Sequence, residues 1–253
     1  IVGRTRRIHV GTNVLALPLR HPTIVAKELA TIDLLSGGRI LPAVSPGLSI
    51  PHQFEACGVS QSERGRRTDE AIVLIRRLWS EEEVTHEGAF YQLHNVTVLP
   101  RPYRPLIPIW IGGRQPAAWK RVGWLGNGWL PSAITTQELA QGIAAIQNPA
   151  QMANRETESE HYGATLGYYI SSSQRKAEEE MVVPAVRRRT DVNMADCSLL
   201  GSPEEIIGKI KKYIETGATK FVLRPMCQPQ EMITQLHLLF TEVVPHFHQP
   251  QEV

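Results

Sequence analysis

The sequence has few cysteines and none of the spacings that cysteine chemistry requires. Cys57, Cys197 and Cys227 stand far apart in a chain of 253 residues, and no C-x-x-C pair occurs. Zinc sites and redox centres use closely paired cysteines, and disulfide frameworks are typical of secreted chains. We therefore interpret the three cysteines as structural or incidental and predict a reducing, cytoplasmic location.

Long apolar runs and one-sided charge are also missing. No stretch approaches the roughly 18 apolar residues of a membrane span, and no signal-peptide pattern occurs. The formal net charge is only +2, and the one basic run, Arg187 to Arg189, is offset by the acidic run Glu178 to Glu180. These absences predict that neither a membrane nor a nucleic acid is a partner.

Several catalytic motifs are absent. The nine histidines form no H-E-x-x-H template, and His246 and His248 stand two apart, a spacing that does not put both on one helical face. No metal site is therefore predicted. No G-x-S-x-G elbow and no P-loop occur, so acyl-transfer hydrolysis and ATP use have no support.

What the sequence does contain is a repeated strand-then-helix pattern in an ordinary globular composition, 42% hydrophobic and 21% charged. An inserted hairpin is predicted from Val84–His86 and Tyr91–Val98. Six strands are predicted, at 9–18, 39–47, 108–113, 128–130, 164–173 and 220–225. Helices are predicted at 22–36, 63–79, 116–125, 136–147, 174–189 (split near Pro184), 203–217 (capped by Ser202 and Glu205) and 231–244.

Alternating strands and helices favour a parallel sheet, either an open doubly wound sheet or a barrel. In both, chemistry sits at the carboxyl ends of the strands. Six strands are too few for a closed eight-stranded barrel. The candidate positions are therefore Thr12 to Leu15, Ser45 to Gly47, Gly112 to Gln115, Trp129 to Pro131, Ser171 to Ser173 and Arg224.

The motif IWIGGRQPAAW is the strongest local signal. Two glycines follow a buried strand, and Arg114 and Gln115 then open a helix. Glycine allows a ligand close to the backbone, and a helix start presents unpaired N–H groups and partial positive charge. These residues alone indicate either a phosphate cradle or a tight turn. Arg224 is a second candidate anion contact, and Trp129 is a candidate contact because it follows a Gly-Asn-Gly turn.

Four blocks then carry a resemblance over nearly the whole chain, from Arg7 to about Phe247. They are GTNVLALPLRHPTIVAKELATIDLLSGGRI, ERGRRTDEAIVLIRRLW, PIWIGGRQPAAWKRVGWLGNGWLP and GSPEEIIGKIKKYIETGATKFVLRP. In this order they resemble the luciferase-like family of flavin-dependent oxidoreductases, whose members use FMN or the deazaflavin coenzyme F420. The resemblance implies an α/β, TIM-barrel-like fold in one domain over residues 1–253, with an insertion at about 84–98.

The resemblance also implies site residues. Thr12, Asn13 and Val14 match the family segment that supports the flavin ring through a non-proline cis peptide, which falls at Asn13-Val14. The family's phosphate loop matches Gly112, Gly113 and Arg114. The further cofactor-binding candidates come from the carboxyl ends of the other predicted strands: Ser45, Gly47, Trp129 and Arg224. His21, in RHP, is the candidate catalytic residue, with a helix-shaping role as the alternative.

Three departures from the family pattern bear on these expectations. An acidic proton donor of some F420 enzymes would fall at Leu48, and the usual Asp before Trp129 is Asn127. If the opening strand is the family's third, the first two have no counterpart, so we expect a barrel that is incomplete at the N-terminus. Its bare strand edges would need cover, which predicts a homodimer or higher homo-oligomer.

These observations predict a flavin- or F420-dependent oxidoreductase or monooxygenase acting on a small organic substrate, with NAD(P)H as co-substrate if the cofactor is FMN. The cofactor supplies the chemistry in such enzymes, so no acid–base pair needs to appear in the sequence. A catalytically impaired cofactor-binding relative is the alternative. A barrel enzyme that acts on a phosphorylated metabolite without flavin is a third possibility.

Overall fold

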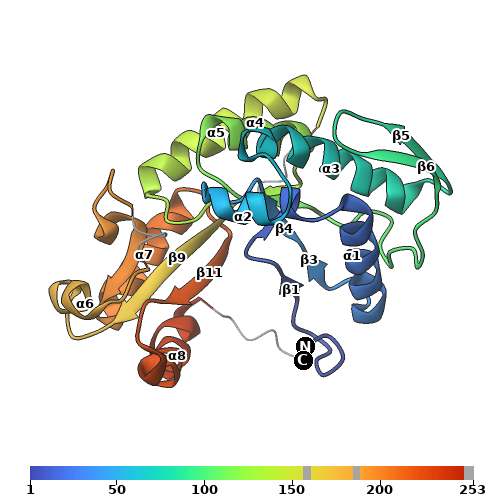
Figure 1. Ribbon diagram of the computed structural model, residues 1–253. Coiled ribbons are helices and arrows are strands. Elements are labelled where there is room, and N and C mark those ends of the chain that lie inside the picture. The colour runs from blue at the N-terminus through green and yellow to red at the C-terminus, as the bar shows by residue number, and fades with distance from the viewer. Residues whose placement is uncertain (156–160, 185–188, 248–253) are drawn as a thin grey trace. The chain divides into compact units, whose positions relative to one another are not determined.

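Parallel strand pairing organises the computed structural model of the chain, in which residues 1–155, 161–184 and 189–247 are described (Figure 1). The chain divides into two units. Unit 1 comprises Ile1–Trp129 and Pro149–Thr157, and unit 2 comprises Leu130–Asn148 and Glu158–Val253. The single domain expected from the family resemblance stays a prediction, and each unit is treated by itself below.

In unit 1 two of the predicted strands are each split into short pieces. The opening strand forms β1 (Val10–Gly11) and β2 (Leu15–Ala16), and the next forms β3 (Ile40–Leu41) and β4 (Ala43–Ser45). β1 pairs with β3, and β2, β4, β7 (Trp110–Ile111) and β8 (Gly128–Trp129) pair in that order, all in parallel. The parallel arrangement predicted from the alternating pattern is thus confirmed, with strands shorter than expected.

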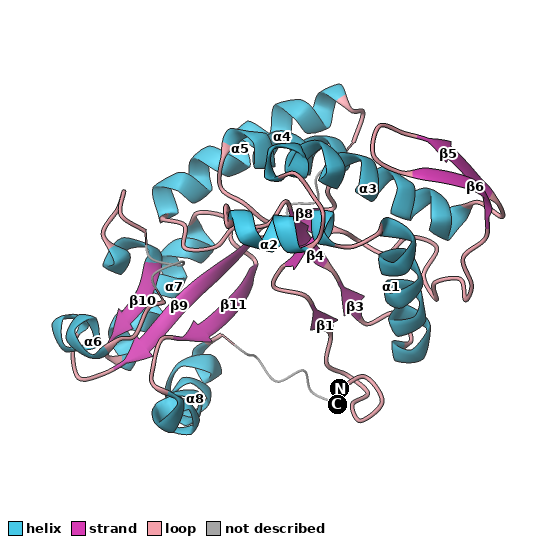
Figure 2. Cartoon of the chain, viewed as in Figure 1, coloured by secondary structure: helices cyan, strands magenta, loops and turns pink. Residues whose placement is uncertain are grey.

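The helices of unit 1 follow from clear start and stop signals. α1 (Pro22–Ser36) begins at a proline and ends at Gly37, which has φ +64° and so takes the left-handed conformation that glycine tolerates. α1 packs against α3 (Arg64–Ser80), as Figure 2 shows. The other elements are α2 (Pro51–Ala56), α4 (Pro116–Leu125), a 3-10 turn at Gln61–Glu63, and the antiparallel hairpin of β5 (Val84–Glu87) and β6 (Gln92–Val96).

A buried ion pair joins α1 to the segment before β7. The Asp33 carboxylate is fully buried and accepts from the Arg104 guanidinium at 2.9 and 3.1 Å and from the Arg104 backbone N–H at 3.0 Å. The same guanidinium donates to the carbonyl of Ile40, in β3. Helix, loop and strand are therefore fastened to one another at a single charged group.

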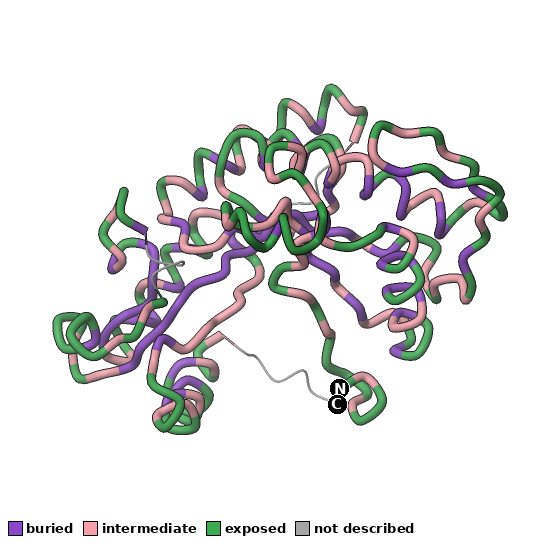
Figure 3. Tube along the Cα trace, in the orientation of Figure 1, coloured by how far each residue is buried: buried purple, intermediate pink, exposed green. Residues whose placement is uncertain are grey.

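Unit 2 is built on a three-stranded parallel sheet in the order β10, β9, β11. The central strand β9 (Gly163–Ile170) is buried along its whole length, which Figure 3 shows in purple. It lies between β10 (Ser198–Gly201) and β11 (Lys220–Pro225). The helices are α5 (Thr136–Met152), α6 (Gln174–Glu180), α7 (Pro203–Glu215) and α8 (Met232–Leu238), and α8 continues through a π-helical turn at Leu239–Val243.

Local signals account for most of unit 2, with two corrections. The capping box of Ser202 and Glu205 at the start of α7 is present as predicted. The strand β10 was not predicted from the sequence, and in unit 1 neither was the helix α2. The helix predicted over 174–189 ends at Glu180, before Pro184 could interrupt it. Part of the predicted range lies outside the described residues.

Replacement of Asp33 by Asn tests the buried pair. The variant leaves the Arg104 guanidinium without its charged partner, and breaking a buried pair from one side costs about 3–5 kcal/mol. Arg104 keeps some solvent access, its side chain being 27% exposed, so we expect a loss near the lower end, measured as the free energy of unfolding in urea. Glu179→Gln breaks the exposed pair with Arg175 and should leave the free energy of unfolding unchanged within error. Equal losses in the two variants would refute the interpretation.

A second prediction concerns the buried Arg189 side chain, which pairs with Glu138 at 2.7 Å and with Asp191 at 2.5 Å. The Arg189 guanidinium holds the pKa of the Glu138 carboxyl below its ordinary value. A lowered pKa means stability that is present above the unfolded-state pKa of about 4.3 and lost as pH falls through the folded one. The stability difference between the unmodified chain and Glu138→Gln should therefore shrink as pH falls below about 4 in urea titrations; a constant difference would contradict this.

Candidate cofactor site

Three loops of unit 1 leave the same edge of its sheet. They follow β2, β4 and β7, which are adjacent parallel strands, so their carboxyl ends must lie together. All the predicted site residues but one belong to this unit. The exception, Arg224, lies half-buried in β11 of unit 2, opposite Gly167 of β9.

The break between β1 and β2 contains the first group of predicted residues. The Asn13–Val14 peptide bond is cis, as the family resemblance implied. The Thr12 hydroxyl donates to the Ala43 carbonyl at 2.6 Å and accepts from the Ala43 N–H at 2.9 Å. Thr12 therefore joins the two split strands through its side chain, while Asn13 and Val14 are exposed.

The turn after β4 is shaped by Ser45 and Gly47. The Ser45 hydroxyl accepts from the Gly47 N–H at 3.1 Å. Gly47 has φ +85°, and a Cβ at this position would lie 3.2 Å from the Phe54 ring and 3.3 Å from the Ala16 Cβ. Only glycine takes this backbone conformation without strain, so the turn lies close against the end of β2.

The loop after β7 has the form of an anion cradle. Gly112 donates its N–H to the Val44 carbonyl at 2.8 Å and extends the sheet by one bond. Gly113 then turns with φ +111°, where a Cβ would lie 2.9 Å from the Ala118 Cβ. α4 begins immediately afterwards with Pro116, and its N-cap residue Gln115 makes no side-chain capping bond. A helix start that its own side chain leaves uncapped presents N–H groups to an incoming anion.

Trp129 supports this loop from inside the protein. Its side chain is fully buried, and its indole N–H donates to the Gly113 carbonyl at 2.7 Å. The ring meets Trp119 of α4 edge-on, with centroids 6.5 Å apart. A side chain with no accessible surface cannot line a ligand directly, so we correct the expected role: Trp129 fixes the Gly113 turn.

His21 lies at the start of α1, just beyond the 3-10 turn Leu17–Leu19 that follows β2. Its Nδ1 accepts from the Thr23 N–H at 3.3 Å, so it is the N-cap of the helix. An Nδ1 that accepts places the proton of the neutral ring on Nε2. The ring is exposed and meets Tyr91 edge-on, with centroids 5.5 Å apart.

The residues after β7 fit the phosphate of a flavin or deazaflavin. The fit rests on the Gly113 cradle, which a Cβ would fill, and on the start of α4 beside it. The half-buried Arg114 adds a full positive charge. The phosphate-cradle interpretation is thereby favoured over a turn with no ligand.

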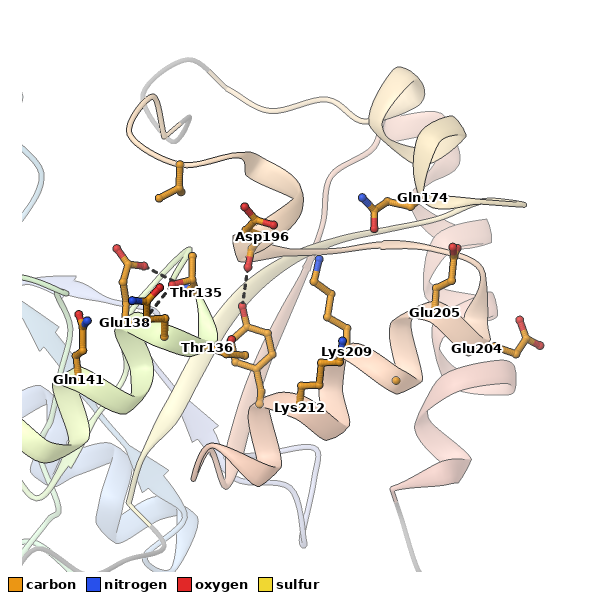
Figure 4. Close-up of a pocket in the computed structure, with 14 residues that line it drawn as sticks. Thr135, Thr136, Glu138, Gln141, Gln174, Asp196, Glu204, Glu205, Lys209 and Lys212 are labelled. Carbon is orange, nitrogen blue, oxygen red and sulfur yellow. Dashed lines mark hydrogen bonds between the residues drawn. The ribbon is translucent and has the colours of Figure 1, made fainter.

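A separate cavity of about 800 Å³ occurs in unit 2 (Figure 4). It lies between α5, α7 and the 3-10 turn Met194–Cys197, and Lys209 of α7 points toward Asp196 in this view. None of the predicted site residues lines it. Its mixture of lysines and carboxylates defines no ligand class, so the loops of unit 1 remain the better site.

Neither a metal cluster nor a membrane-spanning helix occurs in the described parts of the chain. Among these residues, no three His, Cys, Asp or Glu side chains gather as a metal site would require. Within the same ranges, no helix has the length and apolar character needed to cross a membrane.

The sequence analysis missed the side chains that surround His21. Tyr91 was predicted only as a strand residue of the hairpin, and Glu70 only as a polar residue of a helix. In the structure the Glu70 carboxylate accepts from the Tyr91 N–H at 3.0 Å and so holds the backbone of the residue whose ring contacts His21. No sequence pattern signals the contact between His21 and Tyr91, which are 70 positions apart in the chain.

Comparison with known proteins gives the family. The model of the luciferase-like monooxygenase family matches residues 1–190. An F420-dependent glucose-6-phosphate dehydrogenase of Amycolatopsis mediterranei is 26% identical over 91% of this chain and 77% of its own length. Another protein of that name, from Kineococcus radiotolerans, is 37% identical, but the match covers 51% of this chain and only 39% of that protein.

Solved structures agree on the fold. An F420-dependent secondary alcohol dehydrogenase has a TM-score of 0.82 at 21% identity, over 98% of this chain and 82% of its own. The F420-dependent tetrahydromethanopterin reductase of Methanopyrus kandleri has a TM-score of 0.76 at 21% identity, over 98% and 85%.

The chain is a parallel β/α protein whose candidate site residues lie mainly in loops at the carboxyl ends of its strands. Within that class, the chain belongs to the luciferase-like monooxygenase family, whose fold is of the TIM-barrel type.

Substitution of Gly113 tests the cradle without any ligand. Gly113→Ala forces an unfavourable φ and a close contact with Ala118, and we expect a loss on the order of 1–3 kcal/mol in the free energy of unfolding. Gly208→Ala makes the same change in α7, where nothing lies within 4 Å of the added Cβ, and should instead stabilise by up to about 1 kcal/mol. If Gly113→Ala raised the free energy of unfolding, as Gly208→Ala should, Gly113 would not be constrained.

Proposed function

We propose that this protein is an oxidoreductase that uses coenzyme F420 or FMN to oxidise, reduce or oxygenate a small organic substrate. The observation that carries the proposal is the Gly113 turn at the start of α4, whose shape excludes a side chain and whose carbonyl is held by Trp129. The names of the curated relatives favour F420 over FMN. When bound, either cofactor supplies the hydride chemistry.

In this proposal the loops after β4 and β7 and the break between β1 and β2 divide the work of binding. Gly113 and Arg114 hold the cofactor phosphate through backbone N–H groups and the Arg114 guanidinium, while the Gly112 N–H fastens their loop to the Val44 carbonyl. Asn13 and Val14 support the ring system from the break between β1 and β2, and Thr12 holds that break in register through Ala43. Ser45 and Gly47 form the neighbouring wall. Arg224, in unit 2, stays an anion contact predicted from the sequence.

His21 is proposed as a residue that contacts the substrate. Because Nδ1 accepts from the Thr23 N–H, the proton of the neutral ring is on Nε2. The Nε2–H can therefore donate a hydrogen bond to a substrate oxygen. The N-cap bond persists while it does so, so one nitrogen positions the ring and the other binds the substrate.

The experiment is a titration of the purified chain with F420 and, separately, with FMN, followed by cofactor fluorescence. Arg114→Gln should weaken the binding of whichever cofactor is bound by about tenfold or more, because a charge-assisted bond to phosphate is worth roughly 1.5–3 kcal/mol. Arg175→Gln, at an exposed arginine of α6, is the matched control and should bind normally. Failure of the unmodified chain to bind either cofactor would refute the proposal.

Turnover then separates an enzyme from a binding protein. Glucose 6-phosphate is the first probe because the curated relatives are named for it. Loss of the visible absorbance of F420 with this probe, and NAD(P)H consumption with FMN, are the readouts. Cofactor binding without turnover across a panel of small alcohols, aldehydes and sugar phosphates would favour the impaired relative.

A further inference from the structure

The inserted hairpin ends in a tip that is fastened to α3. Residues 88–91 form a turn closed by a bond from the Gly88 N–H to the Tyr91 carbonyl, 3.0 Å. The Glu70 carboxylate accepts from the N–H of Phe90 at 3.1 and 3.2 Å and from the N–H of Tyr91 at 3.0 Å. One helical side chain therefore satisfies two consecutive backbone donors of the tip.

His86 of β5 completes this clamp. Its Nε2 lies 3.1 Å from the Glu70 carboxylate, and its Nδ1 lies 3.5 Å from an Arg77 guanidinium nitrogen. Because arginine can only donate, Nδ1 accepts, and the ring proton is on Nε2, where it donates to Glu70. Burial alone would raise the pKa of Glu70, but the bonds from His86, Phe90 and Tyr91 outweigh it and lower the pKa, so the carboxylate stays charged.

Steric fit makes the clamp specific. A Cβ on Gly88 would lie 1.9 Å from a Glu70 carboxylate oxygen and 2.3 Å from the His86 Nε2. A side chain at position 88 would displace the Glu70 carboxylate or the His86 ring from these positions. The tip, the helix and the strand close this tightly around Glu70 because residue 88 is glycine.

The consequence of the clamp appears at Tyr91. Its side chain is only 6% exposed, and its ring meets the His21 imidazole edge-on at 84°. His21 is otherwise held through Nδ1, by the Thr23 N–H. A bond at one nitrogen leaves the ring free to tilt about that bond, and the Tyr91 ring is the neighbour that restricts the tilt.

We propose that Glu70 is a positioning residue for His21, acting by holding the hairpin tip so that the Tyr91 ring fixes the orientation of the imidazole. The inference rests on the proposed function, in which the Nε2–H of His21 donates a hydrogen bond to a substrate oxygen. It assigns a purpose to the inserted hairpin: its tip supports the reacting face of unit 1 from the side.

The test measures the His21 ring directly and needs no cofactor. In a chain with ¹³C-labelled histidine, the His21 ring resonances are identified by their disappearance in His21→Asn, because asparagine preserves the N-cap. Tyr91→Leu removes the neighbouring aromatic ring and sets the full chemical-shift change. Glu70→Ala should reproduce at least half of that change, and Glu70→Gln, which keeps one oxygen acceptor, a smaller part of it.

Controls separate positioning from loss of fold. Glu179→Gln removes the same charge at an exposed pair and should leave the His21 resonances in place. Circular dichroism establishes that each variant is folded, and Glu70→Gln provides the measurement if Glu70→Ala is not. The proposal is overturned if folded Glu70 variants leave the His21 resonances unmoved, or if Tyr91→Leu itself moves nothing.

Cofactor titration keeps this inference distinct from the proposed function. Glu70 is not among the cradle residues, so Glu70→Gln should bind F420 or FMN as the unmodified chain does. If the unmodified chain binds neither, the proposed function fails while the chemical shifts still decide the role of Glu70. If Glu70→Gln loses cofactor affinity with unmoved His21 resonances, Glu70 acts on the cofactor site and the positioning role is wrong.

Discussion

The arrangement of unit 1 depends on the two hydrogen bonds between the Thr12 hydroxyl and the backbone of Ala43. β1 ends at Gly11 and β3 ends at Leu41, so the regular ladder is interrupted at this point. A hydroxyl can donate and accept at once, and Thr12 uses both capacities on one residue of the neighbouring strand. The register of β1 with β3 is thereby carried across to β2 and β4, and the loops that leave them keep a fixed spacing.

Buried charge does the same work in the helical layer of unit 1. Asp33 fastens α1 to the Arg104 segment and to β3, while Arg121 of α4 is buried against Asp69 of α3. Such pairs are costly to break from one side, because the remaining charge has lost its water. They therefore favour one packing of the helices over near alternatives. The packing of α1 and α4 against their neighbours is thereby fixed at Asp33 and Arg121, and with it the two helices beside which His21 and Arg114 lie.

The sequence predicted those elements whose signals are local. α1 was predicted to the residue because a proline begins it and a glycine pair ends it, and α7 because Ser202 and Glu205 form its cap. β10 was not predicted, because its four small and apolar residues stand directly before a strong helix signal and resemble the segment that leads into that helix. The early end of α6 escaped because no glycine or capping residue marks Glu180.

The site was predictable to the level of segments, and less so for individual side chains. Glycines at strand ends indicated the loops after β4 and β7, since a positive φ at Gly47 and Gly113 is a requirement of the backbone. The roles of Thr12 and Trp129 depend instead on which atoms lie beside them after folding. A tryptophan after a glycine turn looks like a ligand contact, yet its indole serves the carbonyl of Gly113.

His21 shows why structural and catalytic interpretations of one residue need not compete. An N-cap must accept a backbone N–H, and a ring nitrogen that does so leaves the other carrying the proton. The structural bond therefore selects the tautomer whose Nε2–H can donate a hydrogen bond to a substrate oxygen, as the proposed function requires. Tyr91 then restricts the tilt that the N-cap bond allows, and Glu70 holds Tyr91 from the neighbouring helix. The orientation of Nε2 is thus set jointly by three stretches of the chain: the start of α1, the Tyr91 ring of the hairpin and the Glu70 carboxylate of α3.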